Sequence, residues 1–344
     1  MLCVRPARLD DLEAIVGLAK LAGPGFTSLA VGEDVLAGRL EKSVKSFSGP
    51  SEISPDHVYL LMLEDAQGAI VGMSAVKAQI GMRDPFFNFR ILKQAQKSSV
   101  TDRRFDMDVL AVVNDLTGST EVGSLFVRAD QRGPNNPVRG AGRLISQARY
   151  MLMAADKNRF ASRVISELRG HVTDEGVSPF WEAIGRKFFH MDFSEADQIS
   201  AEKDNQFILD LLPKHPIYAA LLPQDAQAVI GQTHPAGAGA RRYLEAEGFR
   251  YDGLIDIFDG GPSMTAPLAD IRTVRGSRLL TLCERRAKAA EHQFTALISN
   301  DDIAGFRCIL TTLEFDGQDA QVDASALERL NLNDGDKARI WIKR

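Results

Sequence analysis

The sequence predicts an α+β protein in which a mixed sheet with flanking helices is followed by a small C-terminal β-barrel. An apolar strand, a glycine-rich turn and an amphipathic helix follow one another between Glu121 and Ala155. Two strand-like runs, His57–Glu64 and Ala69–Val76, are joined by turn residues, as in a hairpin. After Pro262 the pattern changes to strands with one short helix, so we expect one domain over residues 1–262 and a barrel domain over residues 263–344.

Length and composition limit the class of protein. With 344 residues the chain can bury a sizeable core, and a formal net charge of −5 gives no footprint for nucleic acid or for an acidic membrane surface. The three cysteines lack the spacing of a disulfide framework or a zinc site, and there is no HExxH motif. No apolar run has the length of a membrane span, and the N-terminus lacks a signal-peptide pattern. We therefore expect a soluble cytoplasmic enzyme of small molecules, with no metal and no permanently bound cofactor.

The elements before the central stretch follow from periodicity and turn residues. Met1–Ala7 alternates as a short strand, and Asp10 is placed to cap a helix with apolar residues at helical spacing. A charged helix is expected over Glu33–Phe47, before the hairpin. After the hairpin come an aromatic loop, Asp84–Arg90, a polar segment without clear pattern, Lys93–Asp108, and a strand, Val109–Asn114.

The elements after the central stretch are shorter. Ser178 and Pro179 have the cap and first-turn chemistry of a helix that continues to Phe189, and Gly248 is placed to end another helix. The remaining expected helices are Gln224–Ile230, Ala240–Glu247 and Ala324–Leu330. The expected strands are Arg163–Leu168, Arg250–Phe258, Ile271–Thr281, Phe294–Asn300, Arg307–Glu314 and Lys337–Ile342.

The central stretch has the chemistry of an anion site. A strand over Ser124–Val127 leads through a basic turn into a helix that opens near Gly142, and the N–H groups of a helix N-terminus suit a phosphate. Glycines allow the backbone to approach a ligand closely. Formal positive charge comes from Arg132, Arg139 and Arg143. The turn contains no GKS or GKT, which argues against a P-loop, and its spacing does not match the dinucleotide fingerprint.

This turn resembles the coenzyme A pyrophosphate loop of the GNAT acyltransferase superfamily. The core of that signature is matched by RGAG at Arg139–Gly142, and extra residues around Pro134–Val138 lengthen the turn. The segment Arg5–Lys20 is also similar to the beginning of many GNAT domains. The resemblance implies a GNAT-like mixed sheet and an acyl-CoA co-substrate.

Ten further segments occur in a fixed order across nearly the whole chain. They are TSL (Thr27–Leu29), DPFFNFR (Asp84–Arg90), NDLTGS (Asn114–Ser119), SLFV (Ser124–Val127), ELRG (Glu167–Gly170), SPFWEAIGRKFF (Ser178–Phe189), LPKHPIY (Leu212–Tyr218), IGQTHP (Ile230–Pro235), EGFRY (Glu247–Tyr251) and IDIFDGGP (Ile255–Pro262). Together they resemble the arginine N-succinyltransferase family, which has a GNAT-type fold with an added C-terminal β-barrel. The resemblance implies transfer of succinyl from succinyl-CoA to the α-amino group of L-arginine, the first step of the succinyl route of arginine catabolism.

A histidine is the expected acid–base group. Attack of an amine on a thioester needs a neutral nucleophile and a proton for the leaving thiolate, and imidazole titrates near neutral pH. Among the six histidines, His234 lies in GQTHP, between a glycine and a proline, in a setting typical of a fixed loop. The resemblance implies that His234 is the catalytic proton donor. His215 is the second candidate because it also lies in a matching segment.

Binding residues follow from the same resemblance. It implies succinyl-CoA binding at Leu125, whose strand can offer backbone groups to the pantetheine amides and one N–H to the developing oxyanion. The complete set expected at coenzyme A is Leu125, Val127, Arg132, Arg139, Gly140, Ala141, Gly142 and Arg143. The succinyl carboxylate is best bound by a bidentate guanidinium, from Arg90 or Arg169. Candidate partners for the substrate's guanidinium are Asp84, Asp115, Glu167, Asp256 and Asp259, among which the sequence does not choose.

Two alternatives stay open from the sequence. The same fold could acylate ornithine or another basic amine, or could use another acyl-CoA. The chain could also be a non-catalytic acyl-CoA-binding subunit that supports a catalytic paralogue. We expect a homo-oligomer, or a hetero-oligomer with a paralogous subunit, in which the barrel could serve as an assembly surface.

Overall fold

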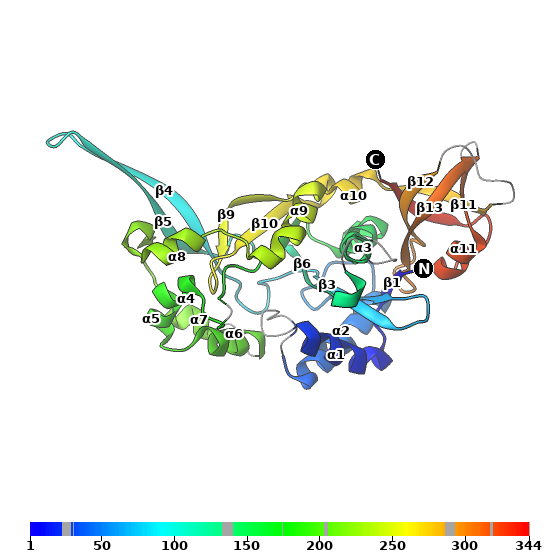
Figure 1. Ribbon diagram of the computed structural model, residues 1–344, viewed down its shortest axis with the longest axis horizontal. Helices are drawn as coiled ribbons and strands as arrows, with labels where there is room; N and C mark the ends of the chain where they lie inside the picture. Colours follow the sequence, from blue (N-terminus) through cyan, green and yellow to red (C-terminus); the bar gives the residue numbers. More distant parts are fainter. Residues whose placement is uncertain are drawn as a thin grey trace. The chain divides into compact units, whose positions relative to one another are not determined.

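The computed structural model describes all residues except 23–28, 30, 133–139, 174, 203–205, 286–292, 317–318 and 344 (Figure 1). The chain forms two compact units, each built from segments that are far apart in the sequence. The first unit contains residues 1–79, 120–162 and 267–344, and the second contains residues 80–119 and 163–266. Within the described residues no helix has both the length and the apolar character needed to cross a bilayer.

The first unit contains an antiparallel sheet with helices on both faces. Its strands are β1 (Cys3–Pro6), β2 (Val58–Glu64), β3 (Ile70–Lys77) and β6 (Thr120–Val127), in that order across the sheet. Helices α1 (Leu12–Ala22) and α2 (Glu33–Ser48) pack with Met73 and Ala75 of β3 in one apolar cluster. Because side chains alternate along a strand, Ser74 points to the opposite face, where its hydroxyl contacts Ile145 of α3 (Ala141–Ala155).

Two serines fix α2 in register on the sheet. The hydroxyl of Ser43 accepts the N–H of Leu60 at 2.9 Å, and that of Ser46 accepts the N–H of Val58 at 3.0 Å. Serine usually disfavours a helix interior because its hydroxyl competes for backbone hydrogen bonds. Here both hydroxyls accept strand N–H groups, and the Ser46 hydroxyl also donates to the carbonyl of Lys42 in its own helix at 2.7 Å. Because the two hydrogen bonds from strand N–H groups hold α2 on β2, the two helical turns that precede Ser43 also lie over β2.

The predicted C-terminal barrel is present in the first unit. It consists of β11 (Arg278–Glu284), β12 (Phe294–Ser299), β13 (Cys308–Asp316), β14 (Asp319–Val322) and β15 (Lys337–Ile342), with helix α11 (Ala324–Leu330). The strand order is β12–β15–β11–β14–β13, and β13 pairs back with β12, which closes the barrel. The first residues of β13 also pair with β1, so barrel and sheet share a strand.

The strand expected over Ile271–Thr281 was wrong in its first half. Residues there form helix α10 (Arg272–Gly276), and β11 begins only at Arg278. The run contains β-branched residues, which favours a strand by propensity alone. In the structure Thr273 is buried against α3 and accepts a hydrogen bond from Gln147 at 3.0 Å. Packing against α3 therefore overrides the local preference.

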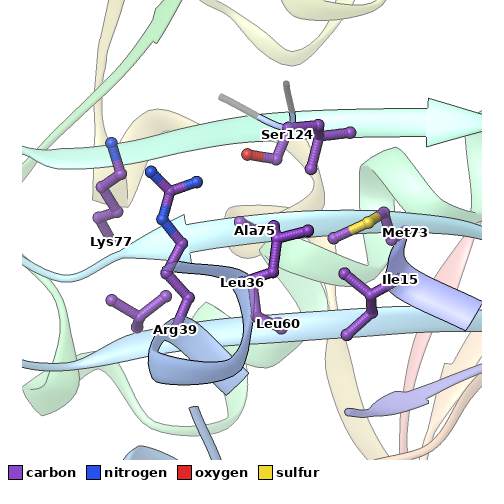
Figure 2. Close-up of a pocket in the computed structure, with 10 residues that line it drawn as sticks. Ile15, Leu36, Arg39, Leu60, Met73, Ala75, Lys77 and Ser124 are labelled. Atoms are coloured by element: carbon purple, nitrogen blue, oxygen red, sulfur yellow. The ribbon is translucent and has the colours of Figure 1, made fainter. Parts of the chain in front are cut away.

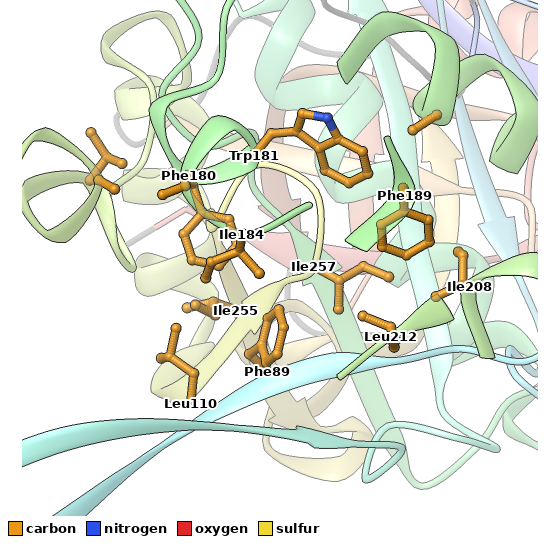
Figure 3. Packing of buried hydrophobic residues seen from close by; sticks show 14 residues of the cluster. Phe89, Leu110, Phe180, Trp181, Ile184, Phe189, Ile208, Leu212, Ile255 and Ile257 are labelled. Carbon is orange, nitrogen blue, oxygen red and sulfur yellow. The ribbon is translucent and has the colours of Figure 1, made fainter. Parts of the chain in front are cut away.

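The second unit combines a sheet with short helices. Its strand order is β7 (Arg163–Glu167), β10 (Pro262–Pro267), β9 (Arg250–Asp256), β4 (Asn88–Ser98), β5 (Arg103–Val113) and β8 (Ile217–Tyr218). The helices are α4 (Pro179–Ala183), α5 (Gly185–Phe189), α6 (Phe193–Glu202), α7 (Gln206–Leu211), α8 (Gln224–Val229) and α9 (Ala238–Glu247). Their core places Phe89, Phe180, Trp181 and Phe189 among aliphatic residues (Figure 3). The Trp181 ring stacks on the rings of Phe189 and Phe258, at centroid distances of 5.3 and 5.5 Å.

Strands β4 and β5 continue into a long two-stranded arm. Their ladder runs from the Asn88–Val113 pair to the Ser98–Arg103 pair, and its outer part, residues 93–108, extends away from the helices of the unit (Figure 1). The polar, poorly patterned segment Lys93–Asp108 therefore forms parts of two strands that the sequence did not predict. Period-two alternation of apolar residues reflects burial of one face, and this ladder buries neither face in its outer part. Cross-strand charge pairs such as Lys93–Asp108, at 2.7 Å, join the strands instead.

Candidate active site

Strand β6 carries a β-bulge at the predicted acyl-CoA residue. Phe126 pairs with Met73 and Gly123 with Ala75, so two residues of β6, Ser124 and Leu125, lie opposite one residue of β3. Ser124 has a φ of +49°, in the left-handed region that residues other than glycine rarely adopt. A bulge takes backbone groups out of the regular ladder and redirects them, and such bulges are frequent beside active sites.

The helix that follows β6 has no side-chain cap at its N-terminus among the described residues. Gly140 is the N-cap of α3 and has a φ of +97°, and a Cβ at this position would lie 2.8 Å from Leu310 Cδ2. The positive φ therefore favours glycine, and a larger residue would also displace the end of the Leu310 side chain. No side chain of the described residues caps the helix, and its first turn contains no acidic residue. The N–H groups of Ala141, Gly142 and Arg143 thus form a site that suits an anion.

The predicted basic residues around this N-terminus make contacts within the protein. The Nε of Arg132 donates to the carbonyl of Val127, and its guanidinium lies 4.8 Å from the centroid of the Phe126 ring. The Nε of Arg143 donates to Gln147 Oε1 at 2.9 Å, and its guanidinium lies 5.8 Å from the Trp341 ring. The Arg132 side chain therefore packs against the last residues of β6, and the Arg143 side chain lies along α3. Arg139 is outside the described residues.

His234 is held in a tight loop of the second unit. Its N–H donates to the carbonyl of Arg169 at 2.8 Å, and its Nδ1 accepts the N–H of Ala236 at 3.2 Å. A ring nitrogen that accepts a hydrogen bond carries no proton, so the neutral imidazole has its proton on Nε2. The ring is half-buried, and its centroid lies 6.0 Å from that of His171. His234 can therefore offer an Nε2–H as a proton donor.

A carboxylate organises the backbone around His234. The N–H of Gly170 donates to Asp259 Oδ2 at 2.6 Å, and that of Gly261 donates to Oδ1 at 2.8 Å. A Cβ on Gly170 would lie 2.3 Å from the carbonyl oxygen of Asp259, so only glycine fits. The N–H of Gly231 donates to the carbonyl of Gly260 at 2.8 Å. Three separate segments thus meet beside His234, and the buried Asp259 carboxylate is used for backbone contacts.

The candidate carboxylates have different surroundings. Glu167, at the end of β7, is half-buried, and its Oε1 accepts the Asn88 amide at 2.9 Å and the Ser263 hydroxyl at 3.2 Å. Asp256 accepts the N–H groups of Phe258 and Asp259 at 2.7 and 3.0 Å. Burial raises the pKa of Asp256, and these hydrogen bonds offset part of that effect. Asp256 therefore caps a turn, whereas Glu167 is held by side chains.

Neutral partners of Glu167 were missed by the sequence interpretation. Asn88 is fully buried, and its amide also donates to the Ser263 hydroxyl at 3.1 Å. Asn88 lies in a segment that matches the family, which was the available signal, but nothing in the local pattern relates it to residue 167. Only the strand order β7–β10–β9–β4 brings Asn88 and Glu167 together.

The candidate arginines for the succinyl carboxylate also differ. Arg90 donates through Nε and Nη2 to one carboxylate oxygen of Asp115, at 2.9 and 2.8 Å, and so has an ionic partner within the protein. The Arg169 side chain is exposed, and Asp84 is exposed as well. The roles of these residues stay predictions. No group of three or more His, Cys, Asp or Glu residues in the described ranges could hold a metal ion.

Comparison with known proteins identifies the class and then the family. The family model described as arginine N-succinyltransferase beta subunit matches residues 2–273, and the model for its C-terminal domain matches residues 278–341. These matches make the chain an acyltransferase. It belongs to the arginine N-succinyltransferase family.

Relatives are similar along the whole chain. An arginine N-succinyltransferase from Citrobacter koseri is 38% identical over 342 residues, which is 99% of this chain and 97% of the relative. One from Escherichia fergusonii is 37% identical over the same shares. Among solved structures, arginine/ornithine succinyltransferase subunit AI from Pseudomonas aeruginosa matches with a TM-score of 0.87 and 32% identity, over 99% of this chain and 98% of that chain.

Proposed function

We propose that this chain transfers succinyl from succinyl-CoA to the α-amino group of L-arginine, as the first step of the succinyl route of arginine catabolism. Family membership and the names of full-length relatives support the reaction. The observation that carries the proposal is the hydrogen bond from Ala236 to His234 Nδ1, because it leaves a proton on Nε2. Thioester aminolysis needs such a donor for its leaving group.

The first unit provides the acyl-CoA site in this proposal. In a GNAT-like arrangement, the thioester binds at the bulge of β6 beside Leu125, and the pyrophosphate binds at the N-terminus of α3. A backbone N–H at the bulge stabilises the oxyanion that forms when the amine attacks the carbonyl carbon. The contacts of Val127, Arg132 and Arg143 keep this strand and helix in place. The division into domains of residues 1–262 and 263–344 stays a prediction. A cytoplasmic location stays a prediction as well.

The second unit provides the acid–base group and the amine contacts. When the C–S bond breaks, the Nε2–H of His234 donates a hydrogen bond to the departing thiolate, and the proton released by the attacking amine passes to that thiolate. Glu167 is the proposed partner of the substrate's cationic end, since its carboxylate is already oriented by Asn88 and Ser263. Among the other candidate contacts, Asp256 and Arg90 have the structural partners described above.

Thiol release measures the proposed reaction directly. We expect succinyl-CoA with L-arginine to give the highest kcat/KM, above succinyl-CoA with ornithine and acetyl-CoA with arginine. Ornithine is the main competing amine, because the solved relative is titled an arginine/ornithine succinyltransferase. A higher kcat/KM with ornithine would favour that alternative. Absence of turnover with every pair would contradict the catalytic proposal and leave the alternative of a non-catalytic subunit.

The exposed arm of residues 93–108 is the observation that favours assembly with a second subunit, which would be either another copy of this chain or a paralogue. An isolated two-stranded hairpin is marginally stable in water, yet strands β4 and β5 and their turn expose Leu92, Val100 and Phe105 by 45%, 93% and 53%. The matched family is described as a beta subunit and the solved relative as subunit AI. A partner that covers these side chains would stabilise the arm.

Shortening the arm is expected to lower the oligomer mass without unfolding the chain. Residues 95–106 would be replaced by Asn-Gly, which joins the paired residues Gln94 and Met107 by a two-residue turn. Light scattering after size-exclusion chromatography gives the mass, and circular dichroism verifies the fold. Lys97→Ala, a polar change on the same arm, serves as the control and should keep the original mass. An unchanged mass in the shortened variant would contradict the role of the arm.

A further inference from the structure

A small cavity lies in the first unit beside the bulge of β6 (Figure 2). It is formed between α1, α2 and strands β2, β3 and β6, and its walls are largely apolar, with Ile15, Leu36, Leu60 and Met73 among them. Its volume is about 60 Å³. Since a single water needs about 10–15 Å³ on this scale, the cavity holds about four to six water-sized groups. A short acyl chain fits that space.

Among the described residues that line the cavity, two are charged, and both are cations. Arg39 follows Leu36 by one helical turn on the same face of α2, and Lys77 follows Met73 and Ala75 on one face of β3. Figure 2 shows Arg39 and Lys77 at one end of the cavity, extended toward β6, with Ile15 and Met73 at the other end. The positive charge is therefore concentrated at one end of an apolar space.

The carboxylate of Glu121 balances part of this positive charge. Lys77 Nζ lies 2.8 Å from Glu121 Oε2, its cross-strand neighbour on β6. These two cations and this carboxylate together carry a net charge of +1. Burial lowers the pKa of Arg39, because the guanidinium loses hydration and attraction to Glu121 offsets only part of that loss. An additional carboxylate here would stabilise the guanidinium.

We propose that this cavity binds the acyl group of the co-substrate, with its terminal carboxylate at Arg39 and Lys77. This inference rests on the proposed use of succinyl-CoA. Ser124, the bulged residue before Leu125, lines the cavity, so a thioester held at the bulge has its acyl chain beside this space. Two methylene groups then lie against apolar walls, and the carboxylate lies at the cationic end. The same cations repel the guanidinium of arginine, which excludes the other substrate from the cavity.

Arg39→Met tests the cavity, since methionine keeps an unbranched chain but removes the charge. We expect kcat/KM for succinyl-CoA to fall about 10- to 100-fold, from the loss of hydrogen bonds to a charged group. Butyryl-CoA has the same chain length without the carboxylate, so its kcat/KM should not fall. Arg39→Lys should restore part of the preference for succinyl-CoA. Lys42→Met, an exposed lysine on the same helix that does not line the cavity, is the matched control.

Binding measurements separate this inference from the proposed reaction. The Kd values of succinyl-CoA and butyryl-CoA, measured by calorimetry, should show the same loss of preference in Arg39→Met even if the chain proved inactive with arginine. The wild-type chain could prove inactive while Arg39→Met still loses the preference for binding succinyl-CoA over butyryl-CoA. That result would contradict the proposed function and support the assignment of the cavity to the acyl group. If Arg39→Met lost affinity for succinyl-CoA and butyryl-CoA equally, the assignment of Arg39 to the acyl carboxylate would be overturned. A rise confined to the KM of arginine in this variant would overturn it as well.

Discussion

Replacing His234 with alanine is expected to lower kcat for succinyl transfer by about two to four orders of magnitude, the usual contribution of a positioned acid–base group. The proton on Nε2 is lost, so the thiolate must leave without a donor. Binding of succinyl-CoA should change little, because the predicted coenzyme contacts at β6 and the α3 N-terminus involve other residues. The measurement is thiol release at saturating substrates, together with the Kd of succinyl-CoA.

A second variant separates proton donation from the structural role of His234. The ring also accepts the N–H of Ala236 at the start of a short 3-10 turn, Pro235–Gly237. In His234→Asn the amide oxygen can accept this N–H, as asparagine does at many N-caps, but the amide cannot donate a proton to a thiolate. We expect this variant to be as slow as His234→Ala. His215→Ala, at an exposed histidine of another matching segment, should keep wild-type turnover. Recovery of turnover in His234→Asn would show that the ring acts only as a cap.

The elements that were predicted well are those with one buried face. The β2–β3 hairpin, α2 and α3 appear within a few residues of the expected ranges, because burial imposes a period of two or 3.6 on their apolar residues. Short β14 was not predicted, and the helix expected through Phe189 is divided into α4 and α5 after Ala183. At the start of α5, Gly185 lies so close to the Trp181 ring that a Cβ there would lie 2.1 Å from it. Such a contact depends on packing that the local pattern does not contain.

The candidate site was predictable where it depends on local chemistry. A glycine-rich turn before a helix, and a histidine between a glycine and a proline, are visible in the chain itself. The role of Asp259 in holding Gly170 and Gly261 was not visible, because it depends on segments that are far apart in sequence. Arg39 was overlooked for a related reason. It is one charged residue in a charged helix, and only the register of α2 on β2 turns it toward the cavity.

Replacing Asp11 with alanine is expected to destabilise the first unit by about 3 kcal/mol, at the lower end of the range for breaking a buried ion pair. The Asp11 carboxylate accepts hydrogen bonds from both terminal nitrogens of Arg5, at 2.7 and 2.9 Å, and both residues are buried. Its loss leaves Arg5 with the ionic partner Glu64, which also pairs with Arg329 of α11 at 3.1 Å. The lower end of the range applies because Glu64 still compensates part of the Arg5 charge.

The pH dependence gives this prediction a second, independent measurement. Burial alone would raise the pKa of Asp11, but hydrogen bonds from Arg5 and from the Arg8 N–H outweigh it, so the pKa lies below its ordinary value. Because the folded pKa is depressed, the stabilisation is present above the unfolded value of about 3.9 and is lost as the pH falls toward the folded value. Urea unfolding should therefore show a large difference between wild type and Asp11→Ala at pH 7, and a smaller difference below about pH 4.

Two further variants identify the origin of the effect. Asp106→Ala removes an exposed partner of Arg104 in the arm and should change the free energy of unfolding by less than about 0.5 kcal/mol. The double replacement Arg5→Met with Asp11→Leu removes both buried charges, and we expect it to be less destabilising than Asp11→Ala alone, since no buried cation loses its partner. If the double variant were the less stable of the two, the attraction between Arg5 and Asp11 would be the main source of stability. The cost of a buried Arg5 without Asp11 would then be a minor effect, contrary to what the burial of both side chains leads us to expect.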